Sequence, residues 1–265
     1  MSKLKSLLKF KKYANGWSLA LIALVLIIGL PIYTLFFKLF EETTDSVWGH
    51  LVDTVLADYI INSIGLVIVV SILTLLMGIS AAWIVSTTNI PFRRQFEWML
   101  ILPLAIPTYI AAYTYAGIFD YTGPIQIFLR DIGFSDLVYI DIMNFWGVAV
   151  VMSLVLFPYV YVVARSTFMS QSATLLEASR ILGSSSWRTF FKIGLPISRP
   201  AIIGGLSLVM MEVLNDYGAV KYYGISTFTT GIFRAWFSFG DPNSAINLSG
   251  ILMAFIFIMI MAERL

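Results

Sequence analysis

The chain of 265 residues contains no cysteine, a single histidine and little charge, because only 12% of its residues are Asp, Glu, Lys or Arg. Without cysteine it can form no disulfide, Cys-ligated zinc site, iron–sulfur cluster or thiol nucleophile. His50 alone cannot supply a multi-histidine metal site. A net charge of +2 also argues against a large nucleic-acid surface, which would gather Lys and Arg on one face.

Hydrophobic side chains dominate what is present. They make up 59% of the chain, and the mean hydropathy is +0.87. Ordinary soluble proteins carry about 25% charged residues, roughly twice the share found here. One soluble core of this size could not remove so many apolar side chains from water, so most of them are expected to face lipid. The composition therefore predicts an integral membrane protein.

Six charge-poor intervals are long enough to cross a bilayer, which takes roughly 20 mainly apolar residues in a helix. Five lysines precede the first interval, as in a secretory signal peptide, but its apolar run is too long and no small-residue cleavage site follows. It is therefore expected to stay as a helix. The predicted spans are residues 13–37, the apolar part of 59–92, 97–120, 141–165, a fifth from about residue 200, and 245–262.

The distribution of charge between the loops predicts the orientation. Of the 17 basic residues, 13 fall on the side of the N-terminus, whereas 12 of the 15 acidic residues fall on the other side or at the outer end of the fifth span. Cytoplasmic loops retain Lys and Arg. We therefore expect an all-α protein with six transmembrane helices, both termini in the cytoplasm, and its longest cytoplasmic loop between helices 4 and 5.

This loop, residues 172–196, carries the clearest local signals. Thr174 and Glu177 have the spacing of a capping box, and Gly183 suits a left-handed helix end. Ser186 can cap a second short helix that holds Trp187, Phe190 and Phe191. A helix that lies on lipid headgroups would fit the same pattern, because basic residues flank it: Arg180, Arg188 and Lys192.

The spacing within the loop favours a more specific interpretation. It resembles the EAA loop of ABC-importer permeases, which reads Glu-Ala-Ala, three residues, Gly, nine residues and Ile-x-Leu-Pro. Ser179 stands where the family has Ala. The resemblance implies that the short helix docks on a separate ATPase subunit and passes its closure to the membrane helices. The residues that match, or stand in for, the motif are Glu177, Ala178, Ser179, Gly183, Ile193, Leu195 and Pro196.

No phosphate-binding loop of the form Gly-x-x-x-x-Gly-Lys-Ser/Thr occurs in the sequence. We therefore expect a transport subunit and not an enzyme, with no catalytic residue, no metal and no directly bound cofactor. ATP would be used by the partner ATPase.

Two further segments, residues 102–113 and 216–236, look like the corresponding stretches of ferric-iron ABC permeases. This resemblance implies iron import across the bacterial inner (plasma) membrane, with a soluble periplasmic binding protein as partner. Because one EAA loop is present, residues 1–265 are expected to form one six-helix half, which is either the N-terminal half of a longer permease or a half that pairs with another. The alternatives are a permease for thiamine, sulfate or polyamine, an intramembrane enzyme, or a channel.

Outside the loop, three further groups of residues have expected roles. Glu212 and Asp216 are four residues apart, share a helix face and are candidates for a gate or path, although a salt bridge to the other half or exposure at the helix end would also explain them. Gly204 and Gly205 are expected to pack against the second half. The candidate contacts for the binding protein are Tyr222, Arg234 and Trp236.

Overall fold

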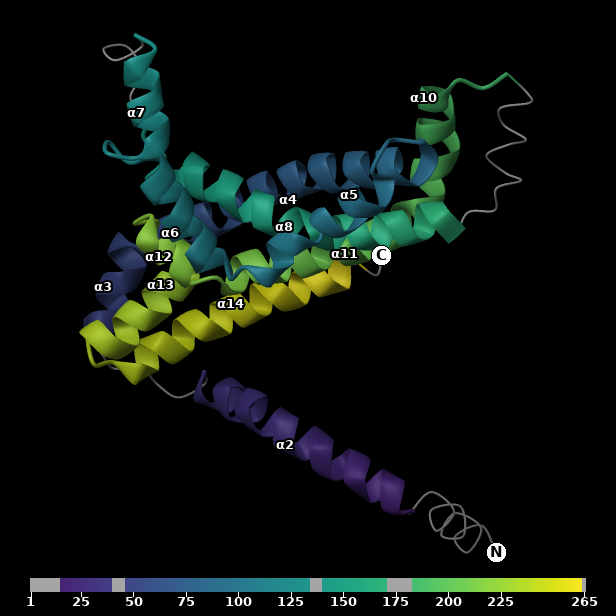
Figure 1. The fold of residues 1–265 in the computed structure, drawn as a ribbon. Coiled ribbons are helices and arrows are strands. Elements are labelled where there is room, and N and C mark those ends of the chain that lie inside the picture. Colours follow the sequence, from purple (N-terminus) through teal and green to yellow (C-terminus); the bar gives the residue numbers. More distant parts are fainter. Residues whose placement is uncertain (1–14, 40–45, 134–139, 171–182, 264–265) are drawn as a thin grey trace, which may run out of the picture.

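The computed structural model describes residues 15–39, 46–133, 140–170 and 183–263, and the regular structure in these ranges is helical, as the composition predicts (Figure 1). The first half of the chain forms α2 (Gly16–Lys38), α3 (Ser46–Thr54), α4 (Leu56–Thr87), α5 (Arg93–Met99), the 3₁₀ turn η1 (Leu102–Ala105), α6 (Thr108–Phe119) and α7 (Pro124–Asp131). The second half forms α8 (Phe145–Ser170), α10 (Ser186–Thr189), the π-helix η2 (Phe190–Gly194), α11 (Leu195–Asn215), α12 (Gly218–Tyr222), α13 (Phe228–Phe233), the π-helix η3 (Arg234–Ser238) and α14 (Pro242–Glu263).

Five of the described helices are long and apolar enough to cross a membrane. They are Gly16–Lys38, Leu56–Thr87, Phe145–Ser170, Ser186–Asn215 and Pro242–Met261. A sixth crossing exists if one bent pair of helices, Arg93–Ala105 and Thr108–Asp131, forms a single span. The described residues therefore give five to six candidate crossings, against the six predicted, and the pair that would form the third crossing is bent by 98°.

The bend in the third crossing follows from its prolines. Ile106 has an extended backbone, with φ −102° and ψ 118°, directly before Pro107. A residue that precedes proline is pushed out of the helical region, and proline itself has no N–H to donate. The prolines here end one helix and start the next, whereas the sequence analysis expected a continuous span from 97 to 120.

The fifth crossing begins earlier than predicted. Helix runs from Ser186 through the π-helical turn η2 into α11 and ends at Asn215, so the expected start near Pro200 was wrong. Pro200 lies inside α11. The basic residues of this segment were assigned to the loop because of their charge, yet they lie in the N-terminal half of the long helix.

Helix α8 is the centre of the packed bundle, with α4 and α11 beside it (Figure 1). Two glycines allow these helices to approach closely. A Cβ atom on Gly78 of α4 would lie 2.8 Å from Cβ of Val160, and one on Gly205 of α11 would lie 2.5 Å from Cγ2 of Val163. The expectation that Gly205 packs against a second half was therefore wrong, since α8 of the same chain covers it.

The first crossing, α2, lies apart from the bundle (Figure 1). None of its side chains is buried, although its sequence is apolar all round. Its end touches α14, because a Cβ on Gly250 would collide with the side chain of Leu39. The rest of its surface requires lipid or another protein as cover.

We expect Gly78→Ala to lower the stability of the protein by about 1–3 kcal/mol, because overpacking forces neighbouring atoms to shift. The added methyl group would also meet the backbone oxygen of Phe157 at 2.9 Å, which cannot move aside as a flexible side chain can. Thermal unfolding of the detergent-purified protein measures the effect. Gly117→Ala in α6 is the control, since no atom lies within 4 Å of its added methyl group. Equal melting temperatures for the two variants would contradict the prediction.

Candidate functional site

Part of the predicted coupling loop lies outside the described residues. Glu177, Ala178 and Ser179 fall within residues 171–182, so the helix expected there stays a prediction. The structure describes both flanks of this segment: α8 as far as Ser170, and the returning chain from Gly183 onward.

Gly183 begins the returning flank in the left-handed region, with φ +77°. This confirms the predicted left-handed turn. A Cβ on Gly183 would meet no atom within 4 Å, so the backbone conformation alone favours glycine here. The helix that follows is capped by Ser185, whose side chain accepts a hydrogen bond from the N–H of Arg188 at 3.3 Å. The prediction of Ser186 as this cap was wrong by one residue.

A tryptophan on α4 joins the two flanks of the loop. The ring of Trp83 lies 5.3 Å from that of Phe168, near the end of α8, and 5.0 Å from that of Phe190, at the start of η2. Such aromatic pairs contribute about 0.5–1.5 kcal/mol each beyond their burial. A Cβ on Gly194 would lie 2.8 Å from Cζ3 of the same tryptophan. The sequence analysis singled out Phe190 but not Trp83, because no local pattern reveals a contact between distant helices.

The remaining motif residues lie where the loop enters the membrane helix. Ile193 belongs to the π-helix η2, and Leu195 and Pro196 occupy the first turn of α11. Proline suits this position because its φ angle is already helical and its missing N–H is not needed there. Leu195 packs against the hydrophobic core. The Ile-x-Leu-Pro segment therefore connects the loop to the core without a break in the helix.

The two candidate gate carboxylates are separated by the end of α11. Glu212 is exposed and accepts a hydrogen bond from the hydroxyl of Tyr159 on α8 at 3.3 Å. Asp216 lies beyond α11, and its Oδ1 accepts from the N–H groups of Ala219 at 2.9 Å and Val220 at 3.3 Å. The expectation of a shared helix face was wrong, because the chain turns into an extended conformation at Asp216.

Asp216 has a structural role that the sequence analysis missed. Its carboxylate caps the short helix α12. Burial raises the pKa of this carboxyl above its usual value, and the two backbone donors act in the opposite direction. A signal was present in the sequence, since Asp followed by Tyr-Gly-Ala is a plausible capping segment.

The segment from Asp216 to Ser238 is fastened to the helices beneath it. The side chain of Asn62 on α4 donates to the carbonyl of Ser226 at 2.9 Å, and the hydroxyl of Thr229 donates to the carbonyl of Asp216 at 2.6 Å. Tyr223 is buried, and burial raises its pKa to about 12, so its hydroxyl stays protonated and donates to the carbonyl of Ala112 at 3.4 Å.

The predicted contacts for a binding protein lie on this anchored segment and are exposed. Tyr222 is 43% exposed and Trp236 is 48% exposed, and Arg234 also faces solvent. The helices that carry them, α12 and α13 with η3, lie at the end of the bundle opposite α10 (Figure 1). The surface therefore combines exposed aromatic rings with a rigid support.

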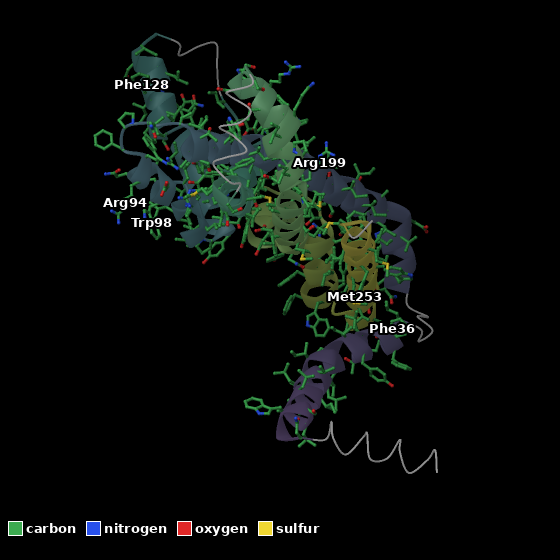
Figure 2. The ribbon with its side chains drawn as sticks, turned by 90° about the vertical axis from the view of Figure 1, so that its right-hand side faces the viewer. Phe36, Arg94, Trp98, Phe128, Arg199 and Met253 are labelled. Carbon is green, nitrogen blue, oxygen red and sulfur yellow. The ribbon has the colours of Figure 1, made fainter. Side chains whose placement is uncertain are left out.

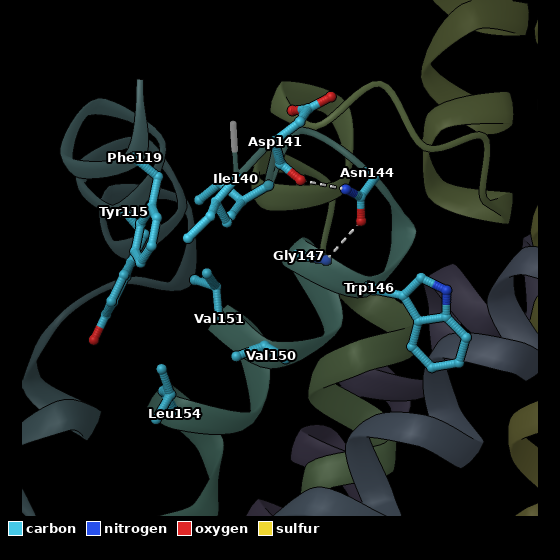
Figure 3. Close-up of a pocket in the computed structure, with 11 residues that line it drawn as sticks. Tyr115, Phe119, Ile140, Asp141, Asn144, Trp146, Gly147, Val150, Val151 and Leu154 are labelled. Atoms are coloured by element: carbon cyan, nitrogen blue, oxygen red, sulfur yellow. Dashed lines mark hydrogen bonds between the residues drawn. The ribbon is translucent and has the colours of Figure 1, made fainter. Parts of the chain in front are cut away.

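A cavity of about 380 Å³ opens between α6 and α8 (Figure 3). Tyr115 and Phe119 of α6 face Val150, Val151 and Leu154 of α8 across it (Figure 3). At its polar edge, the amide of Asn144 donates to the carbonyl of Asp141 and accepts from the N–H of Gly147. The amide oxygen of Asn144 thereby caps α8, and most of the other residues that line the cavity are apolar.

Within the described ranges, no three His, Asp or Glu side chains are grouped so that they could hold a metal ion.

The family of binding-protein-dependent transport system inner membrane components matches residues 74–262 of the chain. The chain belongs to this family. It is thus a permease subunit of a binding-protein-dependent ABC importer and a multi-pass protein of the inner membrane, and it transports without being an enzyme.

Relatives and solved structures agree with this assignment. The sulfate transport system permease protein CysT of Escherichia coli is 28% identical over 209 residues, which cover 78% of this chain and 72% of the relative. The Fe(3+)-transport system permease protein FbpB 2 of Haemophilus influenzae is 26% identical over 245 residues, which cover 91% of this chain but 44% of the relative. The crystal structure of a bacterial alginate ABC transporter in complex with a periplasmic protein has a chain with the same fold, with a TM-score of 0.78, 18% identity and coverage of 96% of this chain and 95% of that chain.

The predicted ABC permease is therefore confirmed. The relatives do not specifically support the predicted resemblance to ferric-iron permeases, because a sulfate permease matches the chain at slightly higher identity.

We expect Gly183→Val to uncouple ATP hydrolysis from uptake, because a β-branched side chain strains the left-handed turn by about 1–2 kcal/mol. Gly183→Asn is the matched control, since asparagine adopts this conformation readily, and it should retain coupling. The ratio of solute imported to ATP hydrolysed by the complete transporter measures the effect. Wild-type coupling in Gly183→Val would refute the role of this turn.

Removing the charge of Glu212 is expected to affect uptake, whereas removing the charge of Asp216 is not. Glu212→Gln keeps an acceptor for Tyr159 and is expected to lower uptake, because it removes an exposed charge from the last turn of α11, the predicted gate position. Asp216→Asn keeps the cap of α12 and should leave uptake unchanged, whereas Asp216→Ala should cost about 1 kcal/mol of stability. Uptake assays and thermal unfolding of the three variants test this, and normal uptake by Glu212→Gln would remove it from the path.

Proposed function

We propose that this chain conducts a small inorganic ion into the cell, driven by ATPase subunits that dock on residues 172–196. One observation carries the proposal: a single helical rod of 30 residues, Ser186–Asn215, runs without interruption from the returning flank of the loop to its last turn at Glu212. Movement of the loop would reach the outer end through this rod. Rocking of packed helices about a central site is the usual way in which transporters alternate access.

Three protein partners follow from this mechanism. ATPase subunits would bind the loop that contains Glu177, Ala178 and Ser179. A soluble binding protein would dock on the exposed surface around Tyr222, Arg234 and Trp236; the solved alginate transporter is likewise in complex with a periplasmic protein. A second six-helix half, in the same chain or another, would complete the path and cover part of the exposed α2.

Sulfate is the first candidate substrate. The support is the similarity to CysT of Escherichia coli, a sulfate permease that the chain matches over 72% of its length. A sulfate ion would arrive already selected by its binding protein, so the permease needs only a path of suitable size and polarity. The apolar cavity between α6 and α8 does not meet that need, which favours a path on another face of the bundle.

Ferric iron is the second candidate, and two observations favour it. The match to FbpB 2 covers 91% of this chain, and residues 102–113 and 216–236 resemble ferric-iron permeases. The exposed carboxylate of Glu212 would also attract a cation and repel sulfate.

A strain of the source organism that lacks this gene distinguishes the candidates. Uptake of ³⁵S-sulfate and of ⁵⁵Fe(III) is measured in the parent, the deletion strain, and the deletion strain that carries either the wild-type gene or Gly183→Val. We expect one of the two ions to be lost on deletion, restored by the wild-type gene and not by the variant. Unchanged uptake of both ions would contradict transport of either one.

A further inference from the structure

A charged cluster joins the inner ends of three helices. Glu97 on α5 contacts Nη2 of Arg165 on α8 at 2.8 Å and Nε of Arg93 at 3.3 Å. Arg93 in turn donates to the carbonyl of Ser86, in the last turn of α4, at 3.3 Å. One carboxylate is thus shared by two guanidinium groups, and α5 is tied to both of its neighbours.

The cluster is partly shielded from solvent. The side chains of Glu97 and Arg165 are 22% and 23% exposed. Tyr161, one helical turn before Arg165, is fully buried. Ion pairs on open surfaces contribute little, but removing one partner of a shielded pair leaves an uncompensated charge and is strongly destabilising. The contact between Glu97 and Arg165 should therefore persist while the helices move.

The position of the cluster relates it to the coupling loop. Arg165 and Phe168 lie in the last turns of α8, directly before residues 171–182. Helix α5 begins the third crossing, which is broken at Pro107 and bent by 98°. The break separates α5 from α6, so α5 is positioned by its contacts with α4, η1 and α8.

We propose that Glu97 and Arg165 are positioning residues that make α5 move with the inner end of α8, so that a movement of the coupling loop also reaches the third crossing. We call this pair the α5–α8 clasp. The inference rests on the coupling role proposed above for residues 172–196. It gives the loop a second output, by which we mean a route that carries its movement to the membrane helices. The first output runs through α11.

Charge removal in the complete transporter tests the clasp. The complex that co-purifies with the tagged chain from its source organism is reconstituted into liposomes. ATP hydrolysis and uptake of ³⁵S-sulfate or ⁵⁵Fe(III), whichever the deletion strain loses, are then measured. Glu97→Gln and Arg165→Gln are expected to lower the number of ions imported per ATP about fivefold, with hydrolysis falling less than uptake.

The matched control is Arg94→Gln, which removes a charge from the outward face of the same helix (Figure 2). It should leave the ratio of ions to ATP unchanged. A purely structural role of the clasp would lower the melting temperature of the Glu97 and Arg165 variants and leave that ratio at its wild-type value, and this result would overturn the proposal.

Covalent rescue provides the second test. Because the chain has no cysteine, Glu97→Cys combined with Arg165→Cys introduces the only two thiols of this subunit. The double variant should be uncoupled. A short bifunctional thiol reagent that bridges the two positions should restore the number of ions imported per ATP. Mass spectrometry of the linked peptides confirms that the bridge has formed. Each single cysteine variant should show no such recovery. A bridged subunit that stays uncoupled would refute joint movement of α5 and α8.

The two proposals fail in different ways. If the loop does not couple the ATPase, Gly183→Val retains wild-type coupling. If only the clasp is wrong, Gly183→Val uncouples transport and Glu97→Gln does not.

Discussion

The close contact of α8 with α4 on one side and α11 on the other is the constraint on which the rest of the structure depends. Apolar helices gain no hydrophobic free energy from association in lipid, so tight van der Waals packing must hold them together. Gly78 and Gly205 provide it by letting two backbones approach α8. The end of α8 thereby acquires a fixed position, and the predicted coupling loop follows that end in the sequence.

Both flanks of the loop are held by this bundle. Trp83 of α4 contacts Phe168 before the loop and Phe190 after it, so one side chain of the packed core touches the outgoing and the returning chain. In the middle of α8, Tyr159 donates to Glu212 in the last turn of α11. Helices α8 and α11 are thus linked near the flanks of the loop and again halfway along α8, so the two helices are positioned together.

Much of this arrangement could be predicted from the sequence, because crossing a bilayer requires long charge-free helices and a left-handed turn after a helix favours glycine, here Gly183. The contacts between helices could not be predicted from the sequence. Glu97 marked only the edge of the predicted span 97–120, but it pairs with Arg165, which is distant in sequence. Asp216 was assigned to a helix face by its spacing from Glu212, whereas its own capping bonds end that regularity. Pro107 carried a breaker signal that membrane helices often tolerate, and here the helix breaks.

The third and fifth crossings differ in continuity, and this difference gives different characters to the two outputs proposed for the loop. The fifth crossing is continuous from Ser186 to Asn215, so a rotation imposed at Ser186 would be transmitted to Glu212 as rotation of a rod. The third crossing bends by 98° near Pro107, so movement of α5 there can be absorbed at the bend and need not reach α6. A loop that drives both helices would shift the inner end of the third crossing while α6, held by Tyr223 through the carbonyl of Ala112, stays with the outer segment. Inner and outer ends of the path can then move unequally, which alternating access requires.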